Sequence, residues 1–268
     1  MAKLFAITLL LVAIGSALLL FWHPWMPPNI SATGAAVDRQ MSSTIAEAGG
    51  AFLLAQILLA AFIWKFSANQ PETKIKSFPG GATGLIITAI ILVGAEVATL
   101  GVFGQKSWAS MFLRPASPDA LTLQVQAEQF AYYFRYPGTD GKFGTIHPEM
   151  MDDSTQNFFG LDRAHDADAK DDIVSSVMAI PVNREIHLLM RSKDVGHSFY
   201  VPELRLQQDF VPGMDLSLHF TAIQTGRYEI MCTQLCGLGH YKMRAYLLVM
   251  SAEDFREWMK KKSLQGTN

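Results

Sequence analysis

The sequence predicts a membrane-anchored all-β protein in which N-terminal apolar helices precede a domain of short strands. Three apolar runs crowd residues 1–104, and the chain beyond them changes to short segments of alternating apolar and polar residues with many turn residues. Half of the 268 residues are hydrophobic, and the mean hydropathy is positive, which is high for a soluble protein. The 22 basic and 24 acidic residues nearly balance, so the composition gives no reason to expect a nucleic-acid partner.

The apolar runs have the length of membrane-spanning helices. They cover about 4–22, 48–66 and 84–103, and each approaches the roughly 20 residues that a helix needs to cross the hydrocarbon core. None has the polar face of a soluble surface helix, although a buried core helix is the alternative for each. We therefore expect a transmembrane helical anchor over 1–104, in contact with membrane lipid.

The first run allows a second interpretation, because residues 1–3 followed by an apolar stretch also resemble a signal segment. No small-x-small cleavage site closes the run directly, and residues 32–36 lie well beyond the usual position of such a site. The anchor is therefore three helices, or two helices plus a signal segment, and we favour the retained helix.

The loops set the expected orientation. Lys65, Lys74 and Lys76 lie between the second and third runs, and the positive-inside rule places this loop in the cytoplasm with Met1. Everything after residue 103 is then outside. In a bacterium this means the cytoplasmic (inner) membrane, with the second domain on the periplasmic face.

The outer domain is expected to be built from strands. Residues 105–120 are predicted as a linker, 121–250 as the strand domain, and 251–268 as a C-terminal helix and tail. The alternation that begins at Leu121 continues to Tyr136 and predicts one long strand. Further strands are expected at 180–183, 186–190, 197–202, 216–220, 226–231 and 244–250. Short strands at this spacing predict a sandwich or barrel.

An acidic segment, 142–172, interrupts the strands. It fits either a solvated loop or an acidic surface that steers a basic partner. His147 and His165 lie in it, and isolated loop histidines are expected to be bystanders.

Four soft-ligand side chains lie within twelve residues: Cys232, Cys236, His240 and Met243. Thiolates with an imidazole and a thioether favour copper or zinc. A disulfide is the first alternative, but one bridge over so small a loop contributes only about 2 kcal/mol and leaves His240 and Met243 unexplained. Zinc gains little from a thioether, so Met243 favours copper. A mononuclear blue-copper site uses one cysteine, whereas two bridging thiolates and two imidazoles suit a copper pair.

The second imidazole must come from elsewhere in the chain. His197 is the best candidate, because it follows a turn over 194–196 and opens a strand. His187 and His219 alternate within apolar strands, and we expect them to pack or to face solvent.

At this point the motifs resemble a known family. The Cys-x-x-x-Cys-Gly-x-x-His-x-x-Met pattern over 232–243, with 194–204 upstream and connecting segments 207–213 and 225–228, resembles subunit II of haem-copper (cytochrome c) oxidases. The resemblance covers the second and third apolar runs and nearly all of the outer domain. It implies a cupredoxin-like Greek-key β-barrel that carries the binuclear CuA centre, tethered by membrane helices.

Carried over by position, the resemblance implies a ligand set for two copper ions. The copper A ligands are His197, Cys232, Gln234 (through its backbone carbonyl), Cys236, His240 and Met243. The two cysteines bridge the ions, each histidine binds one, and the thioether is a weak ligand. Asp194, beside the ligand loop, is implied to support a ligand or to lie on the electron path.

The implied reaction is transfer of single electrons. The resemblance implies that the chain accepts electrons from cytochrome c or another small donor and passes them to haem in subunit I. Oxygen is reduced to water there and protons are pumped, so the complex is an oxidoreductase and translocase of the respiratory chain. This chain has no haem ligand set of its own, so haem is expected only in the partner subunit and no catalytic residue here. Other membrane subunits are further expected partners.

Several positions depart from the family pattern. Gln234 stands where the family usually has a Glu that helps hold magnesium, so the resemblance does not carry magnesium binding over to this chain. Phe130 and Tyr132 occupy positions that are tryptophan-rich in the family's electron-entry patch, and packing is an equal alternative to an electron-entry role. Glu96, inside the third run, is a functional candidate without an assigned role.

Two other functions use the same ligands. The chain could serve a haem-copper nitric oxide reductase, because the motifs indicate a copper site but not whether oxygen or nitric oxide is the terminal acceptor. From another class, the chain could be a membrane-anchored copper-binding chaperone. A fixed site in a buried core suits resident copper better than exchangeable copper.

Overall fold

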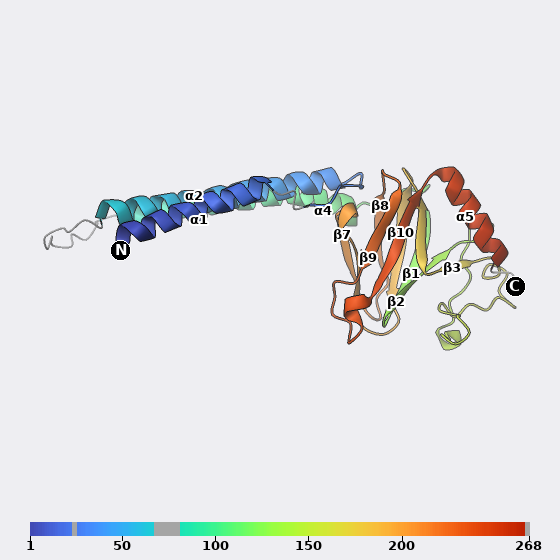
Figure 1. Cartoon of the computed structure of the whole chain (residues 1–268). Helices are drawn as coiled ribbons and strands as arrows, with labels where there is room; N and C mark the ends of the chain where they lie inside the picture. Colours follow the sequence, from blue (N-terminus) through green and yellow to red (C-terminus); the bar gives the residue numbers. More distant parts are fainter. Residues whose placement is uncertain (23–25, 67–80, 266–268) are drawn as a thin grey trace. The chain divides into compact units, whose positions relative to one another are not determined.

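The structure is a computed structural model that describes residues 1–22, 26–66 and 81–265. It divides into two compact units. One comprises Met1–Pro27 and Ala36–Trp108, and the other comprises Pro28–Ala35 and Ala109–Asn268. The first unit contains apolar helices and the second contains the strands (Figure 1).

The helical unit confirms the prediction of N-terminal apolar helices. Helices α1 (Ala2–Trp22), α2 (Gly34–Phe66) and α3 (Gly81–Thr99) are joined in chain order, and α3 continues through a π-helical turn, Leu100–Gly104, into α4, Gln105–Phe112. In the described part of the chain, three helices are long and apolar enough to cross a membrane.

Two boundaries differ from those expected. Helix α2 begins at Gly34 and not near residue 48, because the polar stretch before the apolar run contains no proline and continues the helix. The expected linker 105–120 is helical over Gln105–Phe112, and the first proline after this helix is Pro115. Lys74 and Lys76, on which the predicted orientation rested, lie outside the described residues.

The strand unit forms two five-stranded sheets within the described residues, and Figure 1 shows them facing one another. The first has the order β3-β2-β1-β5-β8 and the second β4-β10-β9-β6-β7. The strands are β1 Leu121–Glu128, β2 Ala131–Tyr136, β3 Ile173–Ser175, β4 Val177–Pro181, β5 Glu185–Ser192, β6 His197–Val201, β7 Leu206–Phe210, β8 Leu216–Thr221, β9 Gly226–Met231 and β10 Arg244–Met250. Pairs β1–β5 and β4–β10 are parallel, and the other strand pairs are antiparallel.

The prediction of one strand from Leu121 to Tyr136 is wrong. The chain turns sharply at Gln129 and Phe130, so β1 and β2 form an antiparallel hairpin in which Glu128 faces Ala131. The turn contains neither Gly nor Pro, and the alternation therefore continues through it unmarked. Strands β3 and β7 were also not predicted.

The strand unit has a main hydrophobic core, and a smaller cluster around Phe159 and Leu161 lies in the acidic segment. Alternate residues of β1, such as Leu123 and Val125, are buried with Phe199 of β6 and Leu247 of β10. Helix α5 (Ala252–Gln265) packs against β3 and β4. The Trp258 ring centroid lies 5.0 Å from that of Tyr136.

The segment Pro28–Ala35 belongs to the strand unit, although in sequence it comprises the end of the connection from α1 and the first two residues of α2. Ile30 is fully buried in the core. Its N–H donates to the Glu203 carbonyl at 2.9 Å, and its carbonyl accepts the Ile223 N–H at 2.8 Å. Residues that were expected to belong to the helical anchor 1–104 are therefore part of the outer domain.

The acidic segment between β2 and β3 is held by its own carboxylates. Asp172 pairs with the guanidinium of Arg135, and neither side chain is exposed. Asp166 accepts the Thr145 N–H at 2.7 Å. Asp171 accepts the Thr139 hydroxyl at 2.7 Å. These contacts give the acidic residues a structural role that composition alone did not indicate.

Candidate metal centre

Two neighbouring parts of the second sheet bring the predicted ligands together. The segment Cys232–Met243 is the connection between β9 and β10, since β9 ends at Met231 and β10 begins at Arg244. His197 is the first residue of β6, which pairs with β9 through Tyr200 and Met231. Neighbouring strand ends therefore place this histidine beside the loop.

The ligand-type atoms are close together. The sulfurs of Cys232 and Cys236 are 3.9 Å apart. Met243 Sδ lies 3.7 Å and His240 Nδ1 lies 3.6 Å from Cys236 Sγ. His197 has a ring nitrogen within 4.8 Å of both cysteine sulfurs.

The carbonyl oxygen of Gln234 lies 3.1 Å from Cys232 Sγ, so the backbone group expected as a ligand also faces the cluster. Both cysteines are free thiols, and their sulfur separation is far beyond a disulfide bond length. The structure thus brings together all six predicted copper A ligands.

The two ring nitrogens of His197 have different environments. Its Nε2 lies 2.8 Å from Asp194 Oδ1, which fixes the plane of the ring. Its Nδ1 is buried and has no hydrogen-bond partner among the described residues. A buried nitrogen that faces two thiols without a partner fits a metal ligand, and a carboxylate on the other nitrogen is the usual support for such a ligand. The residues present therefore fit copper.

The two thiols differ in acidity. Burial opposes ionisation of Cys232, but the nearby His197 imidazole and backbone N–H groups outweigh it and lower the pKa to about 6. Burial and the neighbouring Cys232 thiolate raise the pKa of Cys236 to about 11. One thiolate is thus present at neutral pH, and a bound cation would favour the second.

Two residues that the sequence did not single out fix the loop to β6. The Ser198 hydroxyl lies 2.7 Å from the Thr233 hydroxyl and accepts the Thr233 N–H at 2.5 Å.

Gly237 has a φ of +138°, a left-handed conformation that favours glycine, and a Cβ there would lie 2.7 Å from Gln129 Nε2. Gln129 therefore lies against the loop, in a contact that no local motif announces.

The two candidate electron-entry aromatics have different environments. Tyr132 is buried, and its hydroxyl donates to the Ser198 carbonyl at 2.6 Å, while burial raises its pKa. This placement favours packing for Tyr132. Phe130 is partly exposed and lies against the ligand loop, since a Cβ on Gly239 would be 2.4 Å from its ring.

Three large apolar side chains on the ligand loop point to solvent. Leu235, Leu238 and Tyr241 are 80%, 98% and 83% exposed. These three residues therefore leave apolar area of the ligand loop open to solvent.

Two pairings account for three further histidines in the described part of the chain. His187 and His219 face each other across β5 and β8 of the first sheet, and His219 Nε2 lies 3.1 Å from the Ser110 carbonyl oxygen. His165 contacts Asp162 on the acidic loop and is largely exposed. Among the described residues, the grouping that could hold a metal is that of His197 with the two cysteines.

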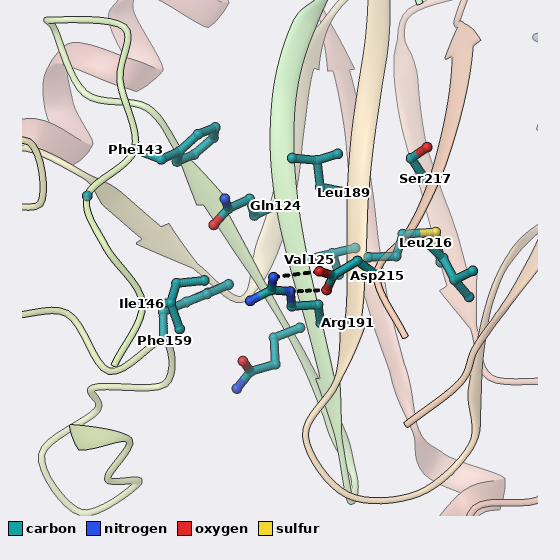
Figure 2. A pocket seen from close by; sticks show the side chains of 13 residues that line it. Gln124, Val125, Phe143, Ile146, Phe159, Leu189, Arg191, Asp215, Leu216 and Ser217 are labelled. Atoms are coloured by element: carbon teal, nitrogen blue, oxygen red, sulfur yellow. Dashed lines mark hydrogen bonds and ion pairs between the residues drawn. The ribbon is translucent and has the colours of Figure 1, made fainter. Parts of the chain in front are cut away.

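A cavity of about 590 Å³ lies elsewhere, between the acidic loop and the first sheet (Figure 2). Phe143 and Phe159 line its loop side, and Gln124 lines its sheet side. The Arg191 guanidinium there is paired with the Asp215 carboxylate, which neutralises its charge. These lining residues do not indicate which kind of ligand the cavity would bind.

Comparison with known proteins identifies the family of the chain. The family profile described as "Cytochrome C oxidase subunit II, periplasmic domain" matches residues 123–250. The chain is 31% identical over 277 residues to the alternative cytochrome c oxidase subunit 2 of Bradyrhizobium diazoefficiens, covering 98% of this chain and 95% of that relative. It is 39% identical over 177 residues to cytochrome c oxidase subunit 2 of Thermostichus vulcanus, covering 66% of this chain and 42% of that relative.

Among solved structures, the chain is similar to the periplasmic domain of subunit II of cytochrome oxidase from Bradyrhizobium japonicum. The identity is 23% and the TM-score 0.41, and the alignment covers 56% of this chain and 97% of that chain.

Proposed function

The chain belongs to the cytochrome c oxidase subunit II family, and we propose that it is the subunit carrying the CuA centre of a respiratory haem-copper oxidase. In this role it accepts single electrons from cytochrome c or another small donor and passes them to haem in subunit I. The observation that carries the proposal is the convergence of two thiols, two imidazoles, a thioether and a backbone carbonyl on one cluster, in which the two cysteines, Met243 and His197 are buried.

The residues that would hold two copper ions are those of the ligand set above. Cys232 and Cys236 supply sulfurs that can each bridge two ions, and His197 Nδ1 is free to bind. When bound, a copper pair that shares one electron supplies one-electron redox chemistry with little change of geometry.

The protein's own contribution is to hold the ligands of this cluster in place. Asp194 orients the His197 ring, and the Ser198–Thr233 contact ties the loop to β6. The exposed side chains of Leu235 and Leu238 offer an apolar surface for the electron partner or for subunit I.

The proposed location is the bacterial cytoplasmic membrane, with the copper domain on the periplasmic face. Three apolar helices of suitable length support a multi-pass anchor. The docking of Pro28–Ala35 in the strand unit supports a topology in which the connection from α1 to α2 lies on the same side as that unit.

Metal analysis and electron paramagnetic resonance of the full chain test the proposal. We expect about two copper ions per chain and a seven-line hyperfine pattern, since an electron shared equally between two copper nuclei couples to both. A single copper, or zinc in its place, would overturn the assignment. Oxygen or nitric oxide consumption by the assembled complex then identifies the terminal acceptor.

The bridging role of Cys236 has its own test. In Cys236→Ser we expect the visible absorption of the shared copper pair to disappear while far-ultraviolet circular dichroism keeps the β signal. An unchanged absorption spectrum would contradict the bridging assignment.

A further inference from the structure

The turn between β1 and β2 touches both segments that supply ligands, although it belongs to the other sheet. The side-chain amide of Gln129 donates to the backbone carbonyl of Cys236, in the middle of the ligand loop. The backbone N–H of Gln129 donates to Asp194 Oδ2 at 2.7 Å. One residue therefore holds two separate parts of the site.

The second of these contacts leads directly to a ligand. The other oxygen of Asp194, Oδ1, lies 2.8 Å from His197 Nε2 and accepts the Val195 N–H at 2.7 Å. A continuous series of hydrogen bonds thus runs from the Cys236 carbonyl through Gln129 and Asp194 to the His197 ring.

The turn also limits where the loop can lie. A Cβ at Gly237 would come within 2.7 Å of Gln129 Nε2, and one at Gly239 within 2.4 Å of the Phe130 ring. The two glycines allow the loop backbone to approach this closely, so the turn and the loop are in direct contact.

We infer that Gln129 is a positioning residue of the metal centre, which sets the location of Cys236 relative to His197 by bonding to both ligand segments. The inference rests on the proposed copper function. Groups that hold ligands in place determine metal affinity and redox properties, and their loss typically lowers affinity 10- to 100-fold.

The test is Gln129→Ala in the full chain, loaded with copper. This variant keeps the backbone N–H to Asp194 and removes only the amide donor to Cys236, so it isolates that contact. We expect copper to be lost to a competing chelator at about 10- to 100-fold lower chelator concentration, with a changed hyperfine splitting and a shifted reduction potential. Gln207→Ala, at an exposed glutamine of β7, is the matched control and is expected to behave as the parent chain.

A measurement without copper separates positioning from general destabilisation. We expect amide hydrogen exchange at residues 237–240 of the copper-free chain to accelerate in Gln129→Ala, with exchange in β1 and β5 unchanged. If Gln129→Ala fails to fold, Gln129→Glu carries the test, because it keeps the side-chain size and replaces the amide donor with an acceptor.

The outcomes distinguish a failure of the proposed copper function from a failure of the positioning role of Gln129. If the parent chain binds no copper pair, the proposed function fails. If the parent chain binds the pair, and the affinity, hyperfine splitting and exchange of the Gln129 variant equal those of the control, the positioning role is overturned while the function stands.

Discussion

The buried ion pair at the base of the acidic loop gives a sharp test of how that loop is held. The Arg135 guanidinium donates to Asp172, to Gln124 Oε1 at 2.9 Å and to the Gly144 carbonyl at 2.6 Å, and its side chain is fully buried. Arg135→Met keeps much of the side-chain volume but leaves the carboxylate uncompensated. Removing one partner of a buried pair costs about 3–5 kcal/mol, and we expect the unfolding free energy of the strand unit to fall by that amount at neutral pH.

The loss should depend on pH in a stated direction. Burial already raises the pKa of Asp172 even beside Arg135, and Oδ1 has no hydrogen-bond partner among the described residues. Without the guanidinium the folded-state pKa rises further. A carboxyl with a raised folded pKa stabilises the fold below its unfolded pKa and loses that contribution as the pH rises through the folded value. The deficit of Arg135→Met against the parent chain should therefore shrink as the pH is lowered.

The assay is urea unfolding of the full chain in detergent, followed by tryptophan fluorescence and by proteolysis of the acidic loop. The double variant Arg135→Met with Asp172→Asn removes both charges, and we expect it to recover most of the loss. About 1–3 kcal/mol should remain, because the Gly144 carbonyl loses its donor. A single variant as stable as the parent, or a double variant less stable than the single one, would refute the reasoning.

Three further outcomes are expected. Ile30→Asp buries a charge in the core, so limited proteolysis should cut within 28–35, whereas the exposed control Ala32→Asp should resist as the parent does. Leu238→Asp should slow electron uptake from the donor about tenfold, equivalent to about 1.4 kcal/mol of lost contact energy. The electron paramagnetic resonance spectrum of the copper should stay unchanged. An unchanged rate would exclude the exposed loop side chains as the docking surface for the donor. The hydrogen bond from the Thr145 N–H lowers the pKa of Asp166 below its ordinary 3.8. The stabilisation by the Asp166 carboxylate is therefore complete above pH 3.8 and is lost as the pH falls through the lower folded pKa. Hydrogen exchange of the Thr145 amide should accelerate in that pH range, and Asp166→Asn should show no such step.

The clustering of the candidate ligands was predictable because these residues carry distinctive chemistry at short spacing. Cys232 to Met243 form one continuous loop, and His197 follows a recognisable turn at the start of a strand. Long apolar runs and period-two alternation likewise indicated the helices and most strands, since both patterns come directly from burial.

Other features depend on contacts that leave no local pattern. Gln129 and Phe130 form a turn without turn residues, and the Gln129 contact with Cys236 joins residues 107 positions apart. The carboxylates of the acidic loop resemble a solvated surface by composition, although Asp172 is buried against Arg135. In each case the partner lies far away in the sequence, so only the folded chain identifies it.

The segment that carries Ile30 has a consequence for how the protein is made. Its backbone pairs with Glu203 and Ile223, residues that leave the ribosome only after α1, α2 and α3 have been synthesised. These backbone pairs can therefore form only late in synthesis, when α1 and α2 on either side of the segment are already made. A domain excised from Ala109 onward would lack this strip and would leave backbone groups at Thr221 and Ile223 unpaired, so appending residues 28–35 should stabilise it.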